Sequence, residues 1–280
     1  QYIRGAYSLV LSTEDKLFIV RDPYGFRPLC LGRLGDAWIV ASESCALDII
    51  SARYIRDIEP GELVVIDTHG LRTFSPCESV KYSFCIFEHI YFSRPDSIIF
   101  GDIVDKTRRK LGKQLALEHP ADADIVISVP DSSNTAALGY SDQSGIKLEI
   151  GLIRNHYIGR TFITPEQDTR SARVRIKFNP VRNVLKGKRV VVVEDSIVRG
   201  TTLQHLVRMI REAGARQVHI RISCPPIISP CFYGIDFQTK KELIANKKTV
   251  DQIREHLGVD SLGYLSLEGM LQTAPNAADH

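Results

Sequence analysis

The 280-residue chain has the composition of an ordinary soluble globular protein, with 44% hydrophobic and 25% charged residues. Its formal net charge of +3 is too small and too dispersed to indicate a nucleic-acid partner, although it suits a phosphate-bearing ligand. The chain has no apolar run of about 18 residues and no signal-peptide pattern, so we expect no membrane association and a cytoplasmic location. The six irregularly spaced cysteines favour reduced thiols or metal ligands over disulfides.

Residues 1 to about 75 carry short β-like runs that are separated by turn residues, such as SLVL, LFIV, LCL and WIVAS. A short helix is expected over 44–50. Strands then resume in YIRDIEPGELVVID, around a second turn that contains Pro-Gly. The pattern predicts antiparallel hairpins.

From about residue 100 the pattern alternates between helix and strand, which is typical of an α/β domain. It predicts a helix over 103–119, a buried strand in DIVISVP, a short helix start in TAALGY and an alternating strand in IKLEIGLI. The polar and basic stretch 154–187 is expected to be an irregular lid or a disordered segment. The strand VVVV, an amphipathic helix from about Thr201 that ends near Gly214, and the strand VHIRI follow.

The string VVVVEDSIVRGTT, residues 190–202, ends a buried strand on two adjacent acids, Glu194 and Asp195. In a parallel sheet the ligand crevice lies beyond the carboxyl ends of the strands. Two adjacent carboxylates are disfavoured there unless solvent, hydroxyl donors or a cation compensates them. The amides at the start of the next helix form a cradle for phosphate. Acids for hydroxyls and amides for phosphate together suit a phosphorylated ribose.

This string is neither a Walker loop nor a dinucleotide fingerprint, because it matches neither glycine spacing. One alternative is an ordinary helix start, with Ser196 or Thr201 as the N-cap and the acids merely solvated. The whole string, however, resembles the phosphoribosyl pyrophosphate signature of type I phosphoribosyltransferases.

A wider resemblance covers nearly all of the chain. It is carried, in this order, by RGAYSLVL, RDPYGFRPL, ASESCALD, YFSRPDS, SVPDSS, GRTFI, EDSIVRGTT, CFYGID and ELIA. These strings are similar to the glutamine phosphoribosylpyrophosphate amidotransferase family. The resemblance implies an α/β type I phosphoribosyltransferase domain with a parallel sheet over 81–280. It also implies that 1–80 form the C-terminal part of an antiparallel N-terminal-nucleophile glutaminase domain.

The resemblance further implies the first reaction of de novo purine synthesis. In that reaction, ammonia released from glutamine displaces pyrophosphate from phosphoribosyl pyrophosphate and gives 5-phosphoribosylamine. A runner-up hypothesis is a non-catalytic phosphoribosyltransferase-like module that senses phosphoribosyl pyrophosphate or a purine nucleotide. In the intact parent we expect a homo-oligomer, with no nucleic-acid or membrane partner.

The site residues are likewise implied by the resemblance. Glu194 and Asp195 are expected to hold the ribose hydroxyls and Mg²⁺, and Ser132 of SVPDSS is a further magnesium position. Taken alone, Ser132 would be a helix N-cap. Arg154 and Arg160 belong to a basic loop that closes over the substrate, or that is simply solvated. The residues expected to wrap the 5-phosphate are Ser196, Ile197, Val198, Arg199, Gly200, Thr201 and Thr202. The sequence departs from the common family pattern at Glu194, often aspartate there, and at His156, commonly arginine.

Cys85 and Cys231 match two ligand positions of the [4Fe–4S] cluster that one branch of the family contains. A cluster normally takes four thiolates, and no cysteine follows Cys231. We therefore interpret the pair as inherited ligands of a cluster that this chain does not complete. The alternative for each is a small buried apolar residue, which is the only interpretation for Cys30, Cys45, Cys77 and Cys224.

The family's glutaminase reaction uses an N-terminal cysteine whose α-amino group is the base. The chain begins with Gln1, so no glutaminase catalytic residue is assigned. Compared with the family, the sequence is expected to be truncated at both ends.

Overall fold

A computed structural model describes residues 3–75, 82–155, 177–237 and 239–274. Contacts divide the chain into two compact units. The first unit contains 1–106 and 231–236, and the second contains 107–230 and 237–280. The predicted domain boundary between residues 80 and 81 stays a prediction.

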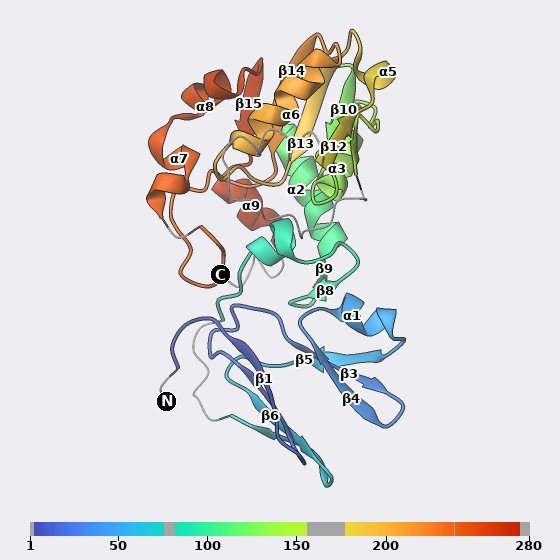
Figure 1. Ribbon diagram of the computed structural model, residues 1–280, viewed down its shortest axis with the longest axis vertical. Helices are drawn as coiled ribbons and strands as arrows, with labels where there is room; N and C mark the ends of the chain where they lie inside the picture. The colour runs from blue at the N-terminus through green and yellow to red at the C-terminus, as the bar shows by residue number, and fades with distance from the viewer. Residues whose placement is uncertain (1–2, 76–81, 156–176, 238, 275–280) are drawn as a thin grey trace. The chain divides into compact units, whose positions relative to one another are not determined.

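The first unit is mainly antiparallel (Figure 1, blue to cyan). One four-stranded sheet has the order β1-β2-β6-β7 and a three-stranded sheet has the order β4-β3-β5. Apolar side chains that alternate along these strands form its main core, which includes Ile19, Leu31 and Val64. The elements of this unit are β1 (Ser8–Ser12), β2 (Leu17–Arg21), β3 (Cys30–Leu34), β4 (Ala37–Ala41), α1 (Ser44–Ile49), β5 (Arg53–Asp57), β6 (Leu63–Asp67), β7 (Gly70–Phe74), the π-helix η1 (Glu88–Phe92), β8 (Ile98–Ile99) and β9 (Asp102–Ile103).

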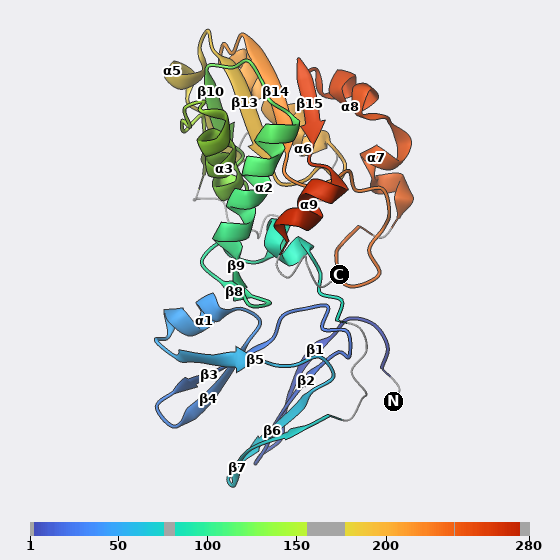
Figure 2. The ribbon, with the colours of Figure 1, turned by 180° about the vertical axis from the view of Figure 1, so that it is seen from behind.

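The second unit is built on a parallel sheet of order β10-β13-β14-β15. Its central strand β13 is buried from Val190 to Val193, as a strand covered by helices on both faces should be. Helix α6 lies in front of the sheet in Figure 1, whereas α2 lies in front of it in the view from behind (Figure 2). The strands are β10 (Ile125–Ser128), β11 (Leu152–Arg154), β12 (Phe178–Pro180), β13 (Arg189–Glu194), β14 (Gln217–Ile222) and β15 (Ser261–Tyr264).

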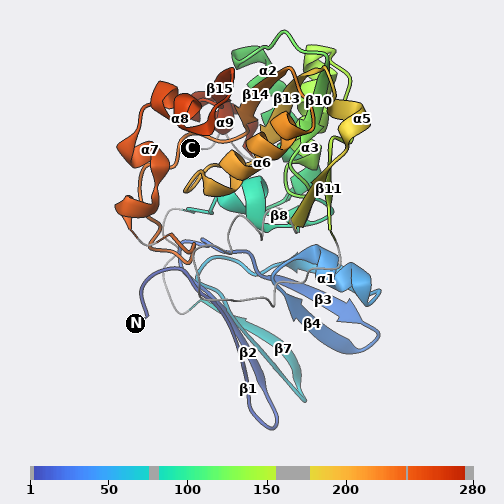
Figure 3. The same ribbon diagram turned by 45° about the horizontal axis from the view of Figure 1, so that its top comes forward.

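The helices of this unit follow the α/β alternation, and α8 packs beside β15 (Figure 3). Helix α6 presents Leu203, Leu206 and Ile210 to the core at helical spacing. Gly214, with φ of +100°, follows the last residue of this helix and its C-cap. The helices are α2 (Val104–Glu118, which starts in the first unit), α3 (Asn134–Ser144), α5 (Arg182–Leu185), α6 (Thr201–Glu212), η2 (Lys240–Glu242), α7 (Ile244–Lys247), α8 (Val250–Leu257) and α9 (Leu267–Thr273).

The predicted fold class is confirmed, because a parallel α/β sheet follows antiparallel sheets. The helices expected over 44–50 and 103–119 are α1 and α2, and the short helix start in TAALGY extends to the eleven residues of α3.

The single strand predicted in IKLEIGLI is wrong. Leu148 forms only an isolated bridge to Val126, and the chain then leaves the sheet before β11, which pairs with β12. At Gly151 the backbone passes so close to Ile127 that a Cβ would lie 2.6 Å from its Cγ2. The stretch 154–187, predicted to be irregular, contains β12 and α5. Its residues 156–176 lie outside the described residues.

Across the described parts of the chain, no helix combines the length and apolar character that crossing a membrane requires.

Candidate functional site

Two loops lie together at the carboxyl edge of the parallel sheet in the second unit. Strands β10 and β13 pair in parallel from Ile125 opposite Val190 to Ser128 opposite Val193, so they end at the same level. The loop after β10 leads into α3, and the loop after β13 leads into α6. Ligands of open α/β sheets bind at this edge. The parallel register therefore brings SVPDSS and EDSIVRGTT side by side.

The acidic pair ends β13 with little exposure. Glu194 is partly buried and accepts a hydrogen bond from the Ser133 hydroxyl, with an Oγ–Oε2 distance of 3.3 Å. Asp195 is only 4% exposed and accepts hydrogen bonds from the hydroxyls of Ser132 and Ser196. Hydroxyls from both loops thus point at the two carboxylates.

These hydroxyls do not fully compensate the buried charge. Burial raises the pKa of Glu194 well above its ordinary value, and the charge of Asp195 raises it further. Burial likewise raises the pKa of Asp195, against the opposing effects of the two serine hydroxyls and the Arg108 guanidinium. The site would gain from a further positive charge.

A hard divalent cation fits this donor set, because Mg²⁺ prefers oxygen ligands and would keep both carboxylates ionised. In the described part of the chain, no three His, Cys, Asp or Glu side chains are grouped so that they could hold a metal on their own. Mg²⁺ commonly takes only one or two protein carboxylates and completes its shell with water and substrate phosphates. Glu194 and Asp195, with the Ser132 hydroxyl beside them, are the residues that would hold it.

The loop between Asp195 and α6 offers backbone donors. Gly200 is the N-cap of α6, with φ of +77°, a conformation that residues with a Cβ rarely adopt. It supplies no side-chain cap to the first amides of the helix, so Thr201 and Thr202 start the helix with N–H groups suited to an anion. The alternative of Ser196 or Thr201 as the N-cap is wrong, and the Ser196 hydroxyl donates to Asp195 instead.

The predicted cationic residues are placed differently from one another. Arg154, at the end of β11, forms an ion pair of 2.6 Å with Asp131 in the loop after β10. Arg199 is ion-paired with Glu242. Arg160, like His156, lies outside the described residues. The structure therefore brings Arg154 to the loop after β10, which contains SVPDSS.

Sequence reasoning missed three residues in or beside the loop that follows β10. Ser133 and Asp131 belong to SVPDSS. The buried strand before this string was a signal for both residues, because it places them at the end of a strand. Ser133 also takes the N-cap position of α3, but with no side-chain cap bond. Arg108 is 2% exposed on α2 and donates to the Ser132 carbonyl at 3.4 Å. No motif marks this arginine, because only the packing of α2 brings it here.

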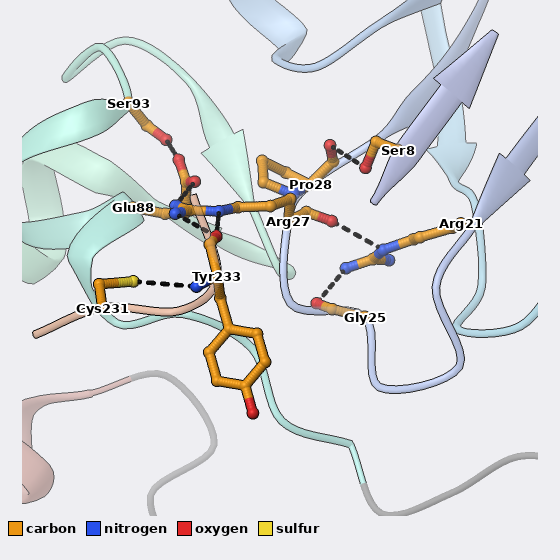
Figure 4. A network of polar contacts seen from close by, with 9 residues as sticks. All are labelled: Ser8, Arg21, Gly25, Arg27, Pro28, Glu88, Ser93, Cys231 and Tyr233. Carbon is orange, nitrogen blue, oxygen red and sulfur yellow. Dashed lines mark hydrogen bonds and ion pairs between the residues drawn. The ribbon is translucent and has the colours of Figure 1, made fainter. Parts of the chain in front are cut away.

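The two predicted cluster cysteines lie in the first unit. Burial raises the pKa of the Cys85 thiol, the Arg27 charge opposes that rise, and a charge on Cys231 adds to it. The two sulfurs are therefore within electrostatic reach of each other. Figure 4 shows Cys231 beside Tyr233, whose amide donates to the Cys231 sulfur at 3.3 Å.

Arg27 holds the segment that contains Cys231 and Tyr233 in place. Its Nε and Nη2 both donate to the Tyr233 carbonyl, at 3.2 and 2.9 Å, and its Nη1 pairs with Glu88 at 2.7 Å (Figure 4). The Ser93 hydroxyl donates to the other Glu88 oxygen, and Phe26 stacks on the Tyr233 ring with centroids 4.3 Å apart. Two thiols are half of what a [4Fe–4S] cluster takes, and the described residues add no third ligand. The described residues alone do not fit a complete cluster.

Comparison with known proteins identifies the family. The phosphoribosyl transferase domain family matches residues 104–253, more than half of the chain and the whole of the edge described above. The chain belongs to the phosphoribosyltransferase family. A second family, the glutamine amidotransferase domain, matches residues 1–48.

Relatives of known sequence are similar to almost the whole chain. The chain is 52% identical to an amidophosphoribosyltransferase of Methanocaldococcus jannaschii, over 96% of the chain and 60% of that relative. It is 54% identical to chloroplastic amidophosphoribosyltransferase 2 of Arabidopsis thaliana, over 95% of the chain and 48% of that relative. The chain thus spans about half to three fifths of the length of these relatives.

A solved structure agrees as well. Glutamine phosphoribosylpyrophosphate amidotransferase from Bacillus subtilis, complexed with ADP and GMP, matches with a TM-score of 0.90 and 51% identity. The match covers 96% of this chain and 59% of that one. The resemblance to the glutamine phosphoribosylpyrophosphate amidotransferases is thereby confirmed.

Proposed function

We propose that the chain is part of an amidophosphoribosyltransferase, in which the second unit transfers a phosphoribosyl group from phosphoribosyl pyrophosphate to ammonia. In the whole enzyme the ammonia would come from glutamine, and the product would be 5-phosphoribosylamine, the first intermediate of de novo purine synthesis. Support comes from the names of relatives about 50% identical. The observation that carries the proposal is the convergence of Ser132, Ser133, Glu194 and Asp195 at one edge of the sheet.

The proposed roles follow from the charges that develop in the reaction. Breaking the bond between ribose C1 and pyrophosphate leaves positive character on the ribose and negative charge on the leaving group. Glu194 and Asp195 would accept hydrogen bonds from the ribose hydroxyls. The amides of Thr201 and Thr202 would bind the 5-phosphate, and bound Mg²⁺ would neutralise charge on the pyrophosphate.

Arg154 would assist at the pyrophosphate end. Its side chain is about half exposed, and its partner Asp131 belongs to the loop that follows β10. An arginine forms paired hydrogen bonds with phosphate oxygens, so it could exchange its Asp131 contact for a pyrophosphate contact when substrate binds. Arg160 is proposed for the same end of the substrate from family resemblance alone.

The alternative is a module that binds phosphoribosyl pyrophosphate or a purine nucleotide without turnover. The Bacillus subtilis structure is described as complexed with ADP and GMP, which makes nucleotide binding a specific alternative for this fold. A site for binding alone would not need the two buried carboxylates, since their charge is costly without a cation.

The test is pyrophosphate release by the purified chain with ammonia as the nitrogen donor, with and without Mg²⁺. We expect magnesium-dependent turnover, which Asp195→Asn abolishes while the circular dichroism spectrum is unchanged. Glu268→Gln makes the matching change at an exposed residue of α9 and should leave turnover intact. Binding of phosphoribosyl pyrophosphate without ammonia-driven turnover, in a folded chain, would favour the sensing module.

Three further features are proposed for the whole enzyme. Cys85 and Cys231 would supply two of the four thiolates of a [4Fe–4S] cluster. The whole enzyme would be a homo-oligomer, and residues 1–80 and 81–280 would belong to separate glutaminase and transferase domains. The cytoplasmic location stays a prediction, since the names of some relatives place them in chloroplasts.

A further inference from the structure

Residues 239–244 contact the loop that joins β13 to α6 at three successive positions. The Ile244 amide donates to the Val198 carbonyl at 2.9 Å. The Glu242 carboxylate forms an ion pair with Arg199. The second Glu242 oxygen accepts a hydrogen bond of 3.1 Å from the Thr239 hydroxyl, so both oxygens have partners. This segment therefore contacts both the backbone and the side chain of the loop.

The same segment packs against Gly200. A Cβ at Gly200 would lie 2.9 Å from Ile244 Cδ1, closer than carbon atoms normally approach. Leu243 is fully buried and Ile244 is 7% exposed, so the surface behind the glycine is packed. The contact fixes the backbone at the point where the amides of α6 begin.

The ion pair also occupies the one cationic side chain of this loop. Arg199 would be the obvious ligand for a phosphate if its guanidinium were directed into the cradle. Instead its charge is compensated by Glu242, which is 28% exposed, less than the 50% of Arg199. A compensated guanidinium contributes little to anion binding, whereas backbone amides at a helix start keep their partial positive charge.

We propose that the ion pair between Arg199 and Glu242 positions residues 196–202, the phosphate loop, without contacting the phosphate. The Arg199 side chain is then not a phosphate ligand. The proposal rests on the proposed function only in taking 196–202 as the phosphate cradle. The pair holds the loop in its binding shape, so less conformational freedom is lost when phosphate binds.

The two roles predict opposite effects for Glu242→Gln. If the pair positions the loop, the variant loosens it, and ribose 5-phosphate binds about two- to fivefold more weakly, the range expected for a partly exposed ion pair. If Arg199 binds phosphate directly, the variant frees the guanidinium and binding becomes tighter. If the pair positions the loop, Arg199→Gln should weaken ribose 5-phosphate binding as much as Glu242→Gln does. The double variant should then bind no more weakly than either single variant.

The experiment measures two quantities on the full 280-residue chain: hydrogen exchange of the Ile244 amide, which donates to the Val198 carbonyl of the loop, and ribose 5-phosphate affinity by calorimetry. Glu242→Gln and Arg199→Gln should both speed exchange about two- to fivefold, whereas Arg199→Lys, which keeps the ion pair, should largely restore the wild-type rate. Glu268→Gln is the matched control.

Tighter binding by Glu242→Gln, or unchanged exchange in both single variants, would overturn the proposal. Hydrogen exchange needs no ligand, so it decides the positioning role even if ribose 5-phosphate fails to bind. That failure would count against the proposed function instead.

Discussion

Replacing Glu194 by glutamine is expected to stabilise the ligand-free chain while removing its response to magnesium. Glutamine has nearly the same shape and can still accept the hydrogen bond from the Ser133 hydroxyl, but it carries no charge. In the wild-type chain, burial and the neighbouring Asp195 raise the pKa of Glu194, so the ionised form is costly in the folded state. The substitution removes that cost.

The pH dependence has a definite sign. A raised pKa means that the folded chain binds the proton more tightly than the unfolded chain does. The wild-type chain therefore loses stability as the pH rises above 4.5, the ordinary value for glutamate, towards the higher folded value. Glutamine does not titrate, so the advantage of Glu194→Gln should grow as the pH rises above 4.5.

Among the described residues, Glu194 accepts one long hydrogen bond, of 3.3 Å, and the magnitude follows from that. Relief of an incompletely compensated buried group is worth on the order of 1–3 kcal/mol. For a unit of this size, each kcal/mol changes the melting temperature by about 2–4 °C. We expect the variant to melt several degrees above the wild-type chain near neutral pH.

The assay is thermal unfolding followed by circular dichroism, from acidic to weakly basic pH, with and without Mg²⁺. At a magnesium concentration about 100 times its Kd, the wild-type chain should gain about 2.7 kcal/mol, most of which Glu194→Gln should lose. Glu268→Gln, at an exposed residue of α9, should show neither effect.

A Glu194→Gln chain that melts at or below the wild-type temperature near neutral pH would refute the argument from buried charge. A variant that keeps the full magnesium response would refute the assignment of Glu194 as a magnesium ligand.

Three other substitutions test the structure. Gly112→Ala should destabilise the second unit by about 3 kcal/mol in urea unfolding, because its Cβ would lie 1.9 Å from the Ala136 carbonyl oxygen; unchanged stability would contradict this close contact. Burial lowers the pKa of His219 below 6.5, so the wild-type chain should lose stability as the pH falls below that value; His219→Gln should flatten this dependence, and an equally steep curve would count against it. Arg27→Gln should speed alkylation of Cys231 on the order of tenfold by mass spectrometry, since the Tyr233 carbonyl loses two charged donors; an unchanged rate would mean that Arg27 does not hold the segment.

The local pattern of the sequence was sufficient for the strand, loop and helix around the acidic pair. Four valines in succession can only be a buried strand or part of a buried helix, and the polar residues after Asp195 end that run. The spacing of Leu203, Leu206 and Ile210 then predicts α6, and α6 begins at Thr201 as expected. These features depend on residues close together in the chain, so they are visible without a fold.

The same reasoning failed where an alternating pattern had no strand to pair with. IKLEIGLI alternates like a half-buried strand, yet it makes only one bridge before Gly151 passes across Ile127. The last strand of the sheet, β15, was not predicted, because its four residues include a glycine and show no clear period. Short elements at the edge of a sheet depend on their neighbours more than on their own residues.

The tertiary structure alone decided the partners of the site. Ser133 lies 61 residues before Glu194 and reaches it only because β10 and β13 pair in parallel with matched ends. Arg199 was expected to wrap the phosphate, and only the packing of 239–244 shows that its partner is Glu242, 43 residues later. Periodicity records which face of an element is buried, but register and packing between distant segments determine which charges meet, and no local pattern encodes them.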